Sequence, residues 1–238
     1  MLQQAKIILE THFGYSSFRN GQEQSIQHVI DRNNTLAIMP TGGGKSICYQ
    51  VPAMLSSGVT LVISPLISLM KDQVDSLRAV GIPATYINSS LSSEEVYERI
   101  QQMKLGKYKL IYVAPERFEL DSFVALIRSL PIQLVAFDEA HCISQWGHDF
   151  RPSYRNVVPV LKQLPSRPIF IALTATATQE VAADIRQLLN IADEHTVITG
   201  FARQNLSFQV LKGENSHSFL IDYVKRHYNL SGIVYTAT

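Results

Sequence analysis

Short apolar runs alternate with amphipathic helical patterns along most of the chain, and this alternation limits the possible folds more than any other feature of the sequence. The runs that we interpret as strands are Thr35–Met39, Val59–Ser64, Ala84–Ile87, Leu110–Val113, Leu134–Phe137, Pro168–Leu173 and Thr196–Ile198. Nearly continuous apolar character is expected of strands that are covered on both faces. The sequence therefore predicts an α/β fold with a doubly wound parallel sheet, which binds ligands at the carboxyl ends of its strands.

The helical patterns between these runs are specific enough to place two helices. Apolar residues recur every three or four positions from Leu66 to Val80, which predicts an amphipathic helix there. Ser92 is followed three residues later by Glu95, a spacing typical of a capping box. A helix is therefore expected to run from this pair to about Met103.

A possible domain boundary follows the last of these strands. We expect residues 1–199 to form one domain, residues 200–205 a linker, and residues 206–238 the incomplete start of a second domain. This last part reads as a strand (Leu206–Leu211), a helix (Ser216–His227) and a strand (Ile233–Tyr235). One βαβ unit cannot cover both faces of its own sheet, so we expect residues 206–238 to be only the first part of a larger domain.

Composition excludes several classes of protein. With 46% hydrophobic and 17% charged residues in 238, the chain is not of the disordered type, and no apolar run approaches the roughly 18 residues of a membrane span. The amino terminus lacks a signal-peptide pattern, and the two cysteines, Cys48 and Cys142, cannot build a disulfide framework or a four-ligand zinc site. We expect a cytoplasmic protein, or a nuclear one in a eukaryote. The net charge of +1 means that any nucleic-acid binding must depend on local groups.

A glycine-rich segment, MPTGGGKS at residues 39–46, joins the first predicted strand to a helix. Such a loop can wrap phosphates with its backbone, while Lys45 reaches the β- and γ-phosphates and Ser46 holds Mg²⁺. Met39 stands where the strict phosphate-loop pattern has glycine, which is a departure. A glycine turn with a solvated lysine is the alternative. The expected nucleotide-binding residues are Thr41, Gly42, Gly43, Gly44, Lys45 and Ser46.

A second polar segment, Asp138-Glu139-Ala140-His141, follows the apolar strand that ends at Phe137. One carboxylate at such a strand tip can hold the metal that Ser46 also touches, and its neighbour can orient and deprotonate the attacking water. We therefore assign Asp138 to Mg²⁺ and Glu139 to the water, with Lys45 as the third catalytic residue. A solvated acidic turn is the alternative, and His141 is either a coupling residue or simply a satisfied polar group.

Together these segments strongly resemble a helicase of the RecQ family, within the second helicase superfamily. The most specific match is His141–Tyr154 (HCISQWGHDFRPSY), the aromatic-rich loop that follows the DEAH box in that family. Four further segments match: FGYSSFRNGQ (13–22), SPLISLMKDQV (64–74), YVAPERF (112–118) and ALTAT (172–176). The resemblance implies two RecA-like lobes with ATP between them. It also implies 3′-to-5′ unwinding of DNA, with ATP and Mg²⁺ as cofactors and single-stranded and partly duplex DNA as partners.

The resemblance also assigns residues around the adenine base. In the family, the segment before the first helicase motif holds adenine, which places Tyr15 and Arg19 against the base and Gln22 on its hydrogen-bonding edge. An aromatic ring and a guanidinium can sandwich a purine, and an amide can donate to and accept from it. Ordinary core packing is the alternative for Tyr15 and the favoured interpretation for Phe18.

The aromatic-rich loop supplies the expected contacts with DNA. Bases stack on rings such as those of Trp146 and Phe150 for about 1 to 3 kcal/mol each, and Arg151 can meet a phosphate or stack. His148 lies in the same loop and is expected to take part in coupling. Because acidic residues offset the basic ones in this segment, stacking should matter more than charge. A buried Trp146 that anchors the loop is the alternative.

Other expected DNA and coupling residues follow other strands. Ser64, Ser68 and Ser89, with Lys71 and Ser90 nearby, can hold phosphates without reading sequence. Thr174 and Thr176 are expected to link the ATP site to the DNA face. Helix capping is the alternative for these serines and threonines.

The family pattern also includes a complete second lobe with arginine fingers and usually a zinc-binding region, which residues 1–238 do not match. We therefore expect the chain to be the ATP-binding motor lobe of an ATP-dependent DNA helicase, with little unwinding by itself. Two other functions stay open: an RNA helicase, against which the 141–154 loop argues, and a non-catalytic ATP-gated nucleic-acid-binding module, against which Glu139 argues.

Overall fold

The computed structural model describes residues 1–200, 206–213 and 215–236. It divides the chain into two units, Met1–Phe201 and Ala202–Thr238, which are described separately below. Within the described residues, no helix combines the length and apolar character that crossing a membrane requires.

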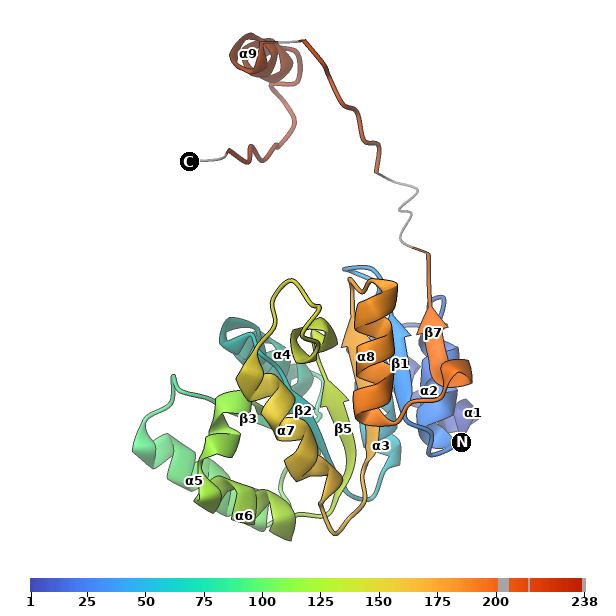
Figure 1. The fold of residues 1–238 in the computed structure, drawn as a ribbon, viewed down its shortest axis with the longest axis vertical. Coiled ribbons are helices and arrows are strands. Elements are labelled where there is room, and N and C mark those ends of the chain that lie inside the picture. Colours follow the sequence, from blue (N-terminus) through green and yellow to red (C-terminus); the bar gives the residue numbers. More distant parts are fainter. Residues whose placement is uncertain (201–205, 214, 237–238) are drawn as a thin grey trace. The chain divides into compact units, whose positions relative to one another are not determined.

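The first unit is built on a seven-stranded sheet in which every pairing is parallel (Figure 1). Its order is β3-β4-β2-β5-β6-β1-β7. The strands are β1 (Thr35–Ile38), β2 (Val59–Ile63), β3 (Ala84–Ile87), β4 (Leu110–Val113), β5 (Ile132–Phe137), β6 (Ile169–Thr174) and β7 (Thr196–Ile198). All seven strands predicted for this unit are confirmed. Their residues are buried, except for Gln133 in β5 and for Thr196 and Ile198 in β7, which forms one edge of the sheet.

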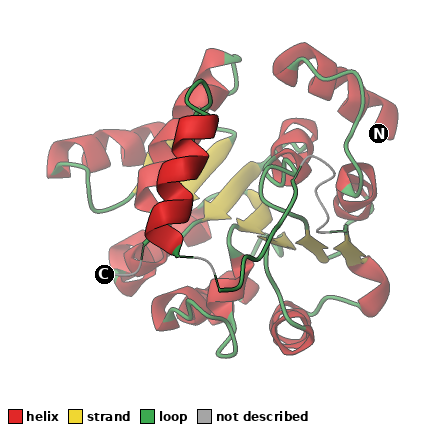
Figure 2. Ribbon diagram, turned by 90° about the horizontal axis from the view of Figure 1, so that it is seen from above, coloured by secondary structure: helices red, strands yellow, loops and turns green. Residues whose placement is uncertain are grey.

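Helices cover both faces of this sheet, as Figure 2 shows from above. On one face lie α2 (Gln22–Ile30), α3 (Ile47–Leu55) and α4 (Ile67–Ala79), with α1 (Leu2–Phe13) packed outside α2 and α3. On the other face lie α5 (Ser93–Lys104), α6 (Asp121–Ser129), α7 (Pro152–Lys162) and α8 (Gln179–Leu189). Alternate strand residues feed these two cores, which confirms the predicted doubly wound α/β fold.

Both helices placed from the sequence are present. In α4, the residues Met70, Val74 and Leu77 are buried on the sheet side, as their spacing predicts. The capping box of α5 is formed, because Ser92 Oγ accepts from the Glu95 N–H at 3.2 Å and Glu95 Oε2 accepts from the Ser92 N–H at 2.8 Å.

The carboxyl edge of the sheet gathers the loops that carry the predicted site. Parallel strands all end at the same edge, so segments distant in sequence meet there. The loops follow β1 (39–46), β2 (64–66), β3 (88–92), β5 (138–151) and β6 (175–178). The neighbouring register of β2 with β5, in which Ile63 pairs with Phe137, brings the second and fourth of these loops side by side.

The second unit contains α9 (Ser216–Arg226), whose first turn is capped by the Asn215 side chain. The prediction of two strands around it, at Leu206–Leu211 and Ile233–Tyr235, is wrong, because the described residues there form no strand. An extended segment becomes a strand only when a neighbour accepts and donates its backbone hydrogen bonds. The predicted linker 200–205 lies, except for Gly200, outside the described residues, and the assignment of 206–238 to a second RecA-like domain stays a prediction.

Candidate functional site

The glycine-rich segment forms a tight loop between β1 and α3. Gly42 and Gly44 have φ angles of 78° and 74°, a left-handed conformation that glycine adopts without strain. At Gly43, an added Cβ would lie 2.9 Å from the Pro40 carbonyl oxygen, so a side chain would force the loop open. The side chain of Met39, the residue that departs from the pattern, is buried in the sheet core. Met39 therefore affects packing in the sheet core, and the conformation of the loop depends on the three glycines.

The polar residues of this loop surround the start of α3. Lys45 Nζ donates to the Met39 carbonyl oxygen at 3.4 Å, so the ammonium lies over the loop itself. Ser46 precedes the first residue of α3, but its side chain makes no capping hydrogen bond, which leaves the hydroxyl for a metal ion. Thr41 lies exposed on the turn of the loop.

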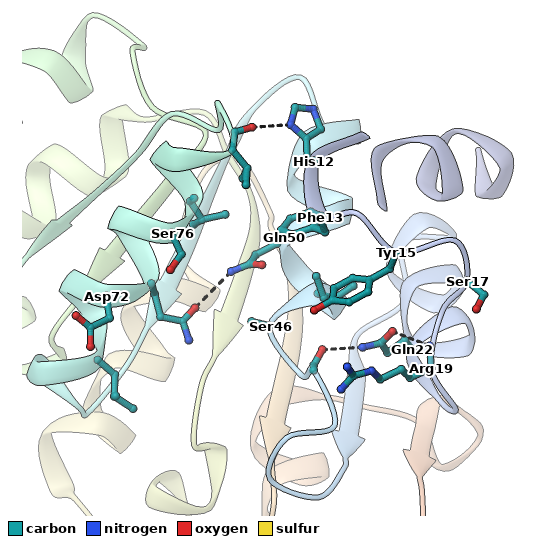
Figure 3. A pocket seen from close by; sticks show the side chains of 16 residues that line it. His12, Phe13, Tyr15, Ser17, Arg19, Gln22, Ser46, Gln50, Asp72 and Ser76 are labelled. Carbon is teal, nitrogen blue, oxygen red and sulfur yellow. Dashed lines mark hydrogen bonds between the residues drawn. The ribbon is translucent and has the colours of Figure 1, made fainter. Parts of the chain in front are cut away.

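The predicted adenine residues lie directly against this loop (Figure 3). Arg19 Cζ is 5.6 Å from the centroid of the Tyr15 ring, and Arg19 Nη1 donates to the Gly42 carbonyl oxygen at 2.6 Å. Because the Tyr15 side chain is 48% exposed, it is no core residue, whereas Phe18 packs partly buried against the core between α1 and α3. The structure thus brings the predicted ring and guanidinium together beside the loop, but the guanidinium already lies over the ring, so a base would contact the pair from the side and not between them.

Gln22 is buried and already engaged with the phosphate loop. Its Nε2 donates to the carbonyl oxygens of Gly43 at 3.1 Å and Gly44 at 2.9 Å, and its Oε1 accepts from the Arg19 N–H at 2.8 Å. An amide nitrogen has two hydrogens, so both are used inside the protein. Gln22 therefore holds the loop in shape, and donating a hydrogen bond to a base would require one of the two Nε2 bonds to be exchanged.

These residues line a pocket of about 480 Å³ whose floor is the start of α3. Tyr15, Arg19 and Gln22 come from one wall, as Figure 3 shows, and residues of α4 form the opposite wall. A planar base with phosphates directed toward Lys45 can enter the pocket from the solvent.

The acidic segment lies at the end of β5. The Asp138 N–H donates to the Ile63 carbonyl oxygen at 2.9 Å, which extends the sheet by one more pairing. Burial and the neighbouring charge of Glu139 together raise the pKa of Asp138 to about 6. The charge of Lys45 acts on both carboxyls and opposes this rise, so the phosphate loop and the acidic segment form one electrostatic site.

Glu139 is held by its neighbours in a conformation rare for a non-glycine residue, with φ of 48°. Its carboxylate oxygen lies 3.3 Å from His141 Nδ1, and the same nitrogen lies 3.0 Å from Thr174 Oγ1. The hydrogen bond with His141, with the charge of Lys45, lowers the pKa of Glu139 below its ordinary value. Glu139 is therefore charged at neutral pH. Thr174 of β6 contacts the acidic segment through His141, and its role in linking the ATP site to the DNA face stays a prediction.

The aromatic-rich loop continues from His141. The ring of His148 stacks on that of His141, with centroids 4.5 Å apart and planes inclined by 12°. Trp146 is 72% exposed, so it is no buried anchor of the loop, and Phe150 is half-buried. A continuous series of contacts thus connects Glu139 with a loop that presents an indole to solvent.

Arg151 is more constrained than expected for a free phosphate ligand. Its Nη1 donates to the Pro65 carbonyl oxygen and its Nη2 to Asp149 Oδ2, both at 3.0 Å. The guanidinium therefore fastens the end of the aromatic-rich loop to the segment that follows β2, and its charge is already matched by Asp149.

The remaining predicted residues divide into exposed and structural ones. Ser68, in the first turn of α4, and Ser89, in the turn after β3, are exposed at the same edge, whereas Ser64 is buried and accepts from the Leu66 N–H at 3.4 Å. Thr174 and Thr176 hydrogen-bond to each other, and α8 is capped by Thr178. Capping therefore does not explain either predicted threonine, while Ser64 supports its own turn.

One protein-family model, described as DEAD/DEAH box helicase, matches residues 19–185, which include the phosphate loop, the acidic segment and the aromatic-rich loop. The chain belongs to this helicase family. Its relatives confirm the RecQ resemblance: it is 55% identical over 239 residues to an ATP-dependent DNA helicase RecQ of Bacillus subtilis, and 46% identical over 233 residues to one of Pasteurella multocida. The chain spans about 40% of the length of the first relative and 37% of the second, and almost all of its own residues align.

Solved helicase structures share the fold. A hypothetical ATP-dependent RNA helicase from Sulfolobus tokodaii gives a TM-score of 0.64 at 18% identity, covering 84% of this chain and 57% of its own. The Hef helicase domain of Pyrococcus furiosus gives 0.59 at 24% identity, covering 76% of this chain and 37% of its own. At such identities the likeness concerns the fold, which is RecA-like as expected.

The structure adds one residue to the site of this family member that the sequence analysis overlooked. The hydroxyl of Tyr154, fully buried on α7, lies within hydrogen-bond distance of two carbonyl oxygens, that of Ile63 at 2.7 Å and that of Asp138, which share its single hydrogen. It thereby fixes the ends of β2 and β5 beneath the acidic segment. Its place at the end of the matched loop motif was a signal, but a tyrosine on an amphipathic helix reads first as core.

Proposed function

We propose that this chain is the ATP-binding motor lobe of a DNA helicase of the RecQ type. The observation that carries the proposal is the series of contacts from Glu139 through His141 and His148 to the loop of exposed Trp146. A nucleotide site joined to an exposed aromatic loop suits an enzyme in which DNA binding and ATP hydrolysis affect each other. Relatives described as ATP-dependent DNA helicases support the same function.

In this proposal the phosphate loop binds ATP through its backbone N–H groups and Lys45. Tyr15 and Arg19 hold the adenine from the side, and Gln22 keeps the loop in the conformation that accepts phosphates. Phosphates would draw Lys45 away from the Met39 carbonyl, a weak contact at 3.4 Å, so little is lost on binding.

Ser46 and Asp138 would hold Mg²⁺, because a hydroxyl and a carboxylate are the oxygen ligands that this ion prefers. Burial and the charge of Glu139 raise the pKa of the half-buried Asp138 carboxyl, and the charge of a divalent cation would stabilise its ionised form. Bound Mg²⁺ would neutralise phosphate charge during transfer. Glu139, charged at neutral pH, would orient the attacking water and accept its proton, with His141 fixing the carboxylate.

Single-stranded DNA would bind across the carboxyl edge of the sheet. Trp146 and Phe150 would stack on bases, and Ser68 and Ser89 would meet phosphates without reading sequence. The 3′-to-5′ polarity and the choice of DNA over RNA rest on the family resemblance. Unwinding would further require a second lobe against which this one closes.

Binding of Mg-ATP to the 238-residue chain tests the proposal. Lys45→Ala should weaken binding by about tenfold or more, because a charge-assisted contact to phosphate is worth about 1.5 to 3 kcal/mol. Glu139→Gln should bind ATP within about threefold of the unsubstituted chain, because Glu139 acts on the water in the reaction and a lost base costs rate. Equal binding by all three chains would contradict the assignment of the loop.

A further inference from the structure

The pocket beside Tyr15 and Arg19 extends from these two residues to a second wall. Its opposite wall is the exposed side of α4, which contributes Leu69, Asp72 and Ser76. Figure 3 shows Asp72 and Ser76 on this helix, across the pocket from Tyr15. A planar purine placed against Tyr15 and Arg19 therefore faces the α4 wall across the pocket.

Hydrogen bonds at two ends of the pocket fix the position of α4 relative to its neighbours. At the top of the pocket, His12 Nδ1 donates to the Val80 carbonyl oxygen at 2.9 Å, which ties the end of α1 to the end of α4. At the back, Gln73 Oε1 accepts from Gln50 Nε2 at 3.3 Å and from the hydroxyls of two buried tyrosines. Because hydrogen bonds at both ends join α4 to its neighbours, the space between the walls belongs to the folded chain.

The chemistry of the α4 wall is that of an amine site. Asp72 makes no ion pair within 4.0 Å among the described residues, since the nearby Lys71 pairs with Asp75 at 2.7 Å. Leu69, which is 45% exposed, and the buried Leu77 offer apolar surface to an alkyl chain that approaches this carboxylate. A carboxylate at the end of an apolar path favours a ligand with a methylene chain and a terminal ammonium.

We infer that the nucleotide pocket continues past the base into a subsite on α4, where Asp72 binds a cationic amine carried on the purine of an adenine nucleotide. The inference rests on the proposed binding of ATP and adds a ligand class to that site. The base lies against Tyr15 and Arg19, the alkyl chain crosses the pocket along Leu69, and the ammonium meets the Asp72 carboxylate.

Three ATP analogues test the subsite, each with an aminohexyl chain on the exocyclic amine, on carbon 8 or on carbon 2 of the purine. The control for each is the same analogue with its terminal amine acetylated, which keeps the chain and removes the charge. At low ionic strength, at least one amine should bind the 238-residue chain about threefold more tightly than its acetylated control. The difference should shrink in high salt.

Two variants locate the effect. Asp72→Asn should abolish the difference between amine and acetylated analogue. Asp75→Asn lies on the same helix, outside the pocket and paired with Lys71, and should retain the difference. If ATP binds but no amine exceeds its control, or if Asp72→Asn keeps the preference, the subsite is overturned while the proposed function stands. Failure of ATP itself to bind would overturn the proposed function and the subsite together.

Discussion

Asp138 shows at the residue scale how a binding site reduces the stability of the fold that carries it. Its folded-state pKa of about 6 lies above the ordinary value of 3.8. Between these two values the folded chain holds a proton that the unfolded chain has released, so folding becomes less favourable as pH rises through this window. Above pH 6 the charged carboxyl costs on the order of 3 kcal/mol, since one pKa unit corresponds to about 1.4 kcal/mol.

Asp138→Asn is therefore expected to raise the free energy of unfolding at pH 7 in the absence of Mg²⁺ and nucleotide. Denaturant melts in chelator at pH 7 and pH 5 measure the effect, which should be larger at pH 7. Asp149→Asn is the matched control, because pairing with Arg151 lowers the pKa of Asp149, and this substitution should not stabilise the chain. A loss of stability in Asp138→Asn at pH 7 would show that its charge is compensated within the protein.

Gln22 gives a second prediction at this scale. Its amide donates to two loop carbonyls, so Gln22→Glu would replace a donor with a charged acceptor facing those oxygens. We expect Gln22→Glu to weaken both ATP and GTP binding by about tenfold or more, because unsatisfied buried groups cost about 1 to 3 kcal/mol. Parallel titrations with both nucleotides measure it. Loss of ATP binding with unchanged GTP binding would instead indicate that Gln22 acts only on the base.

At the scale of elements, Tyr154 joins β2 and β5 below the acidic segment. Tyr154→Phe keeps the buried ring and removes the hydroxyl, so we expect a loss of about 0.5 to 1.5 kcal/mol in the free energy of unfolding. The ends of both strands should also lose amide protection near Ile63 and Asp138. Hydrogen exchange resolves this local effect. Tyr97→Phe, on the exposed side of α5, is the control and should change neither quantity.

Among the helices, strands and loops, the features with a local sequence pattern could be predicted, and the contacts between distant segments could not. The seven strands of the sheet and the α5 capping box follow from local patterns, because burial on both faces and a cap leave a signature in a few consecutive residues. The strands at 206–211 and 233–235 were wrong because the same apolar signature has no pairing partner among the described residues there. Contacts between segments that are distant in sequence, such as Arg151 with Pro65 or Gln22 with Gly44, depend on how the elements pack and leave no local signal.

At the scale of the whole first unit, one sheet edge carries the phosphate loop, the acidic segment and the aromatic-rich loop. The order β2-β5-β6-β1 places the strands that precede these segments, and Thr174, next to one another. Where one ligand changes the affinity of the other through such a connected set of side chains, the reverse effect has the same factor. The proposal therefore implies that ATP and single-stranded DNA are coupled through His141 and His148.

Trp146 allows this coupling to be measured directly, because it is the only tryptophan of the chain and is 72% exposed. Its fluorescence should change saturably when single-stranded DNA is added. The apparent DNA affinity should shift when a non-hydrolysable ATP analogue and Mg²⁺ are present, and Lys45→Ala should remove that shift. If labelled DNA binds by anisotropy while the emission of Trp146 stays constant, the aromatic-rich loop is not the DNA contact and the central claim is contradicted.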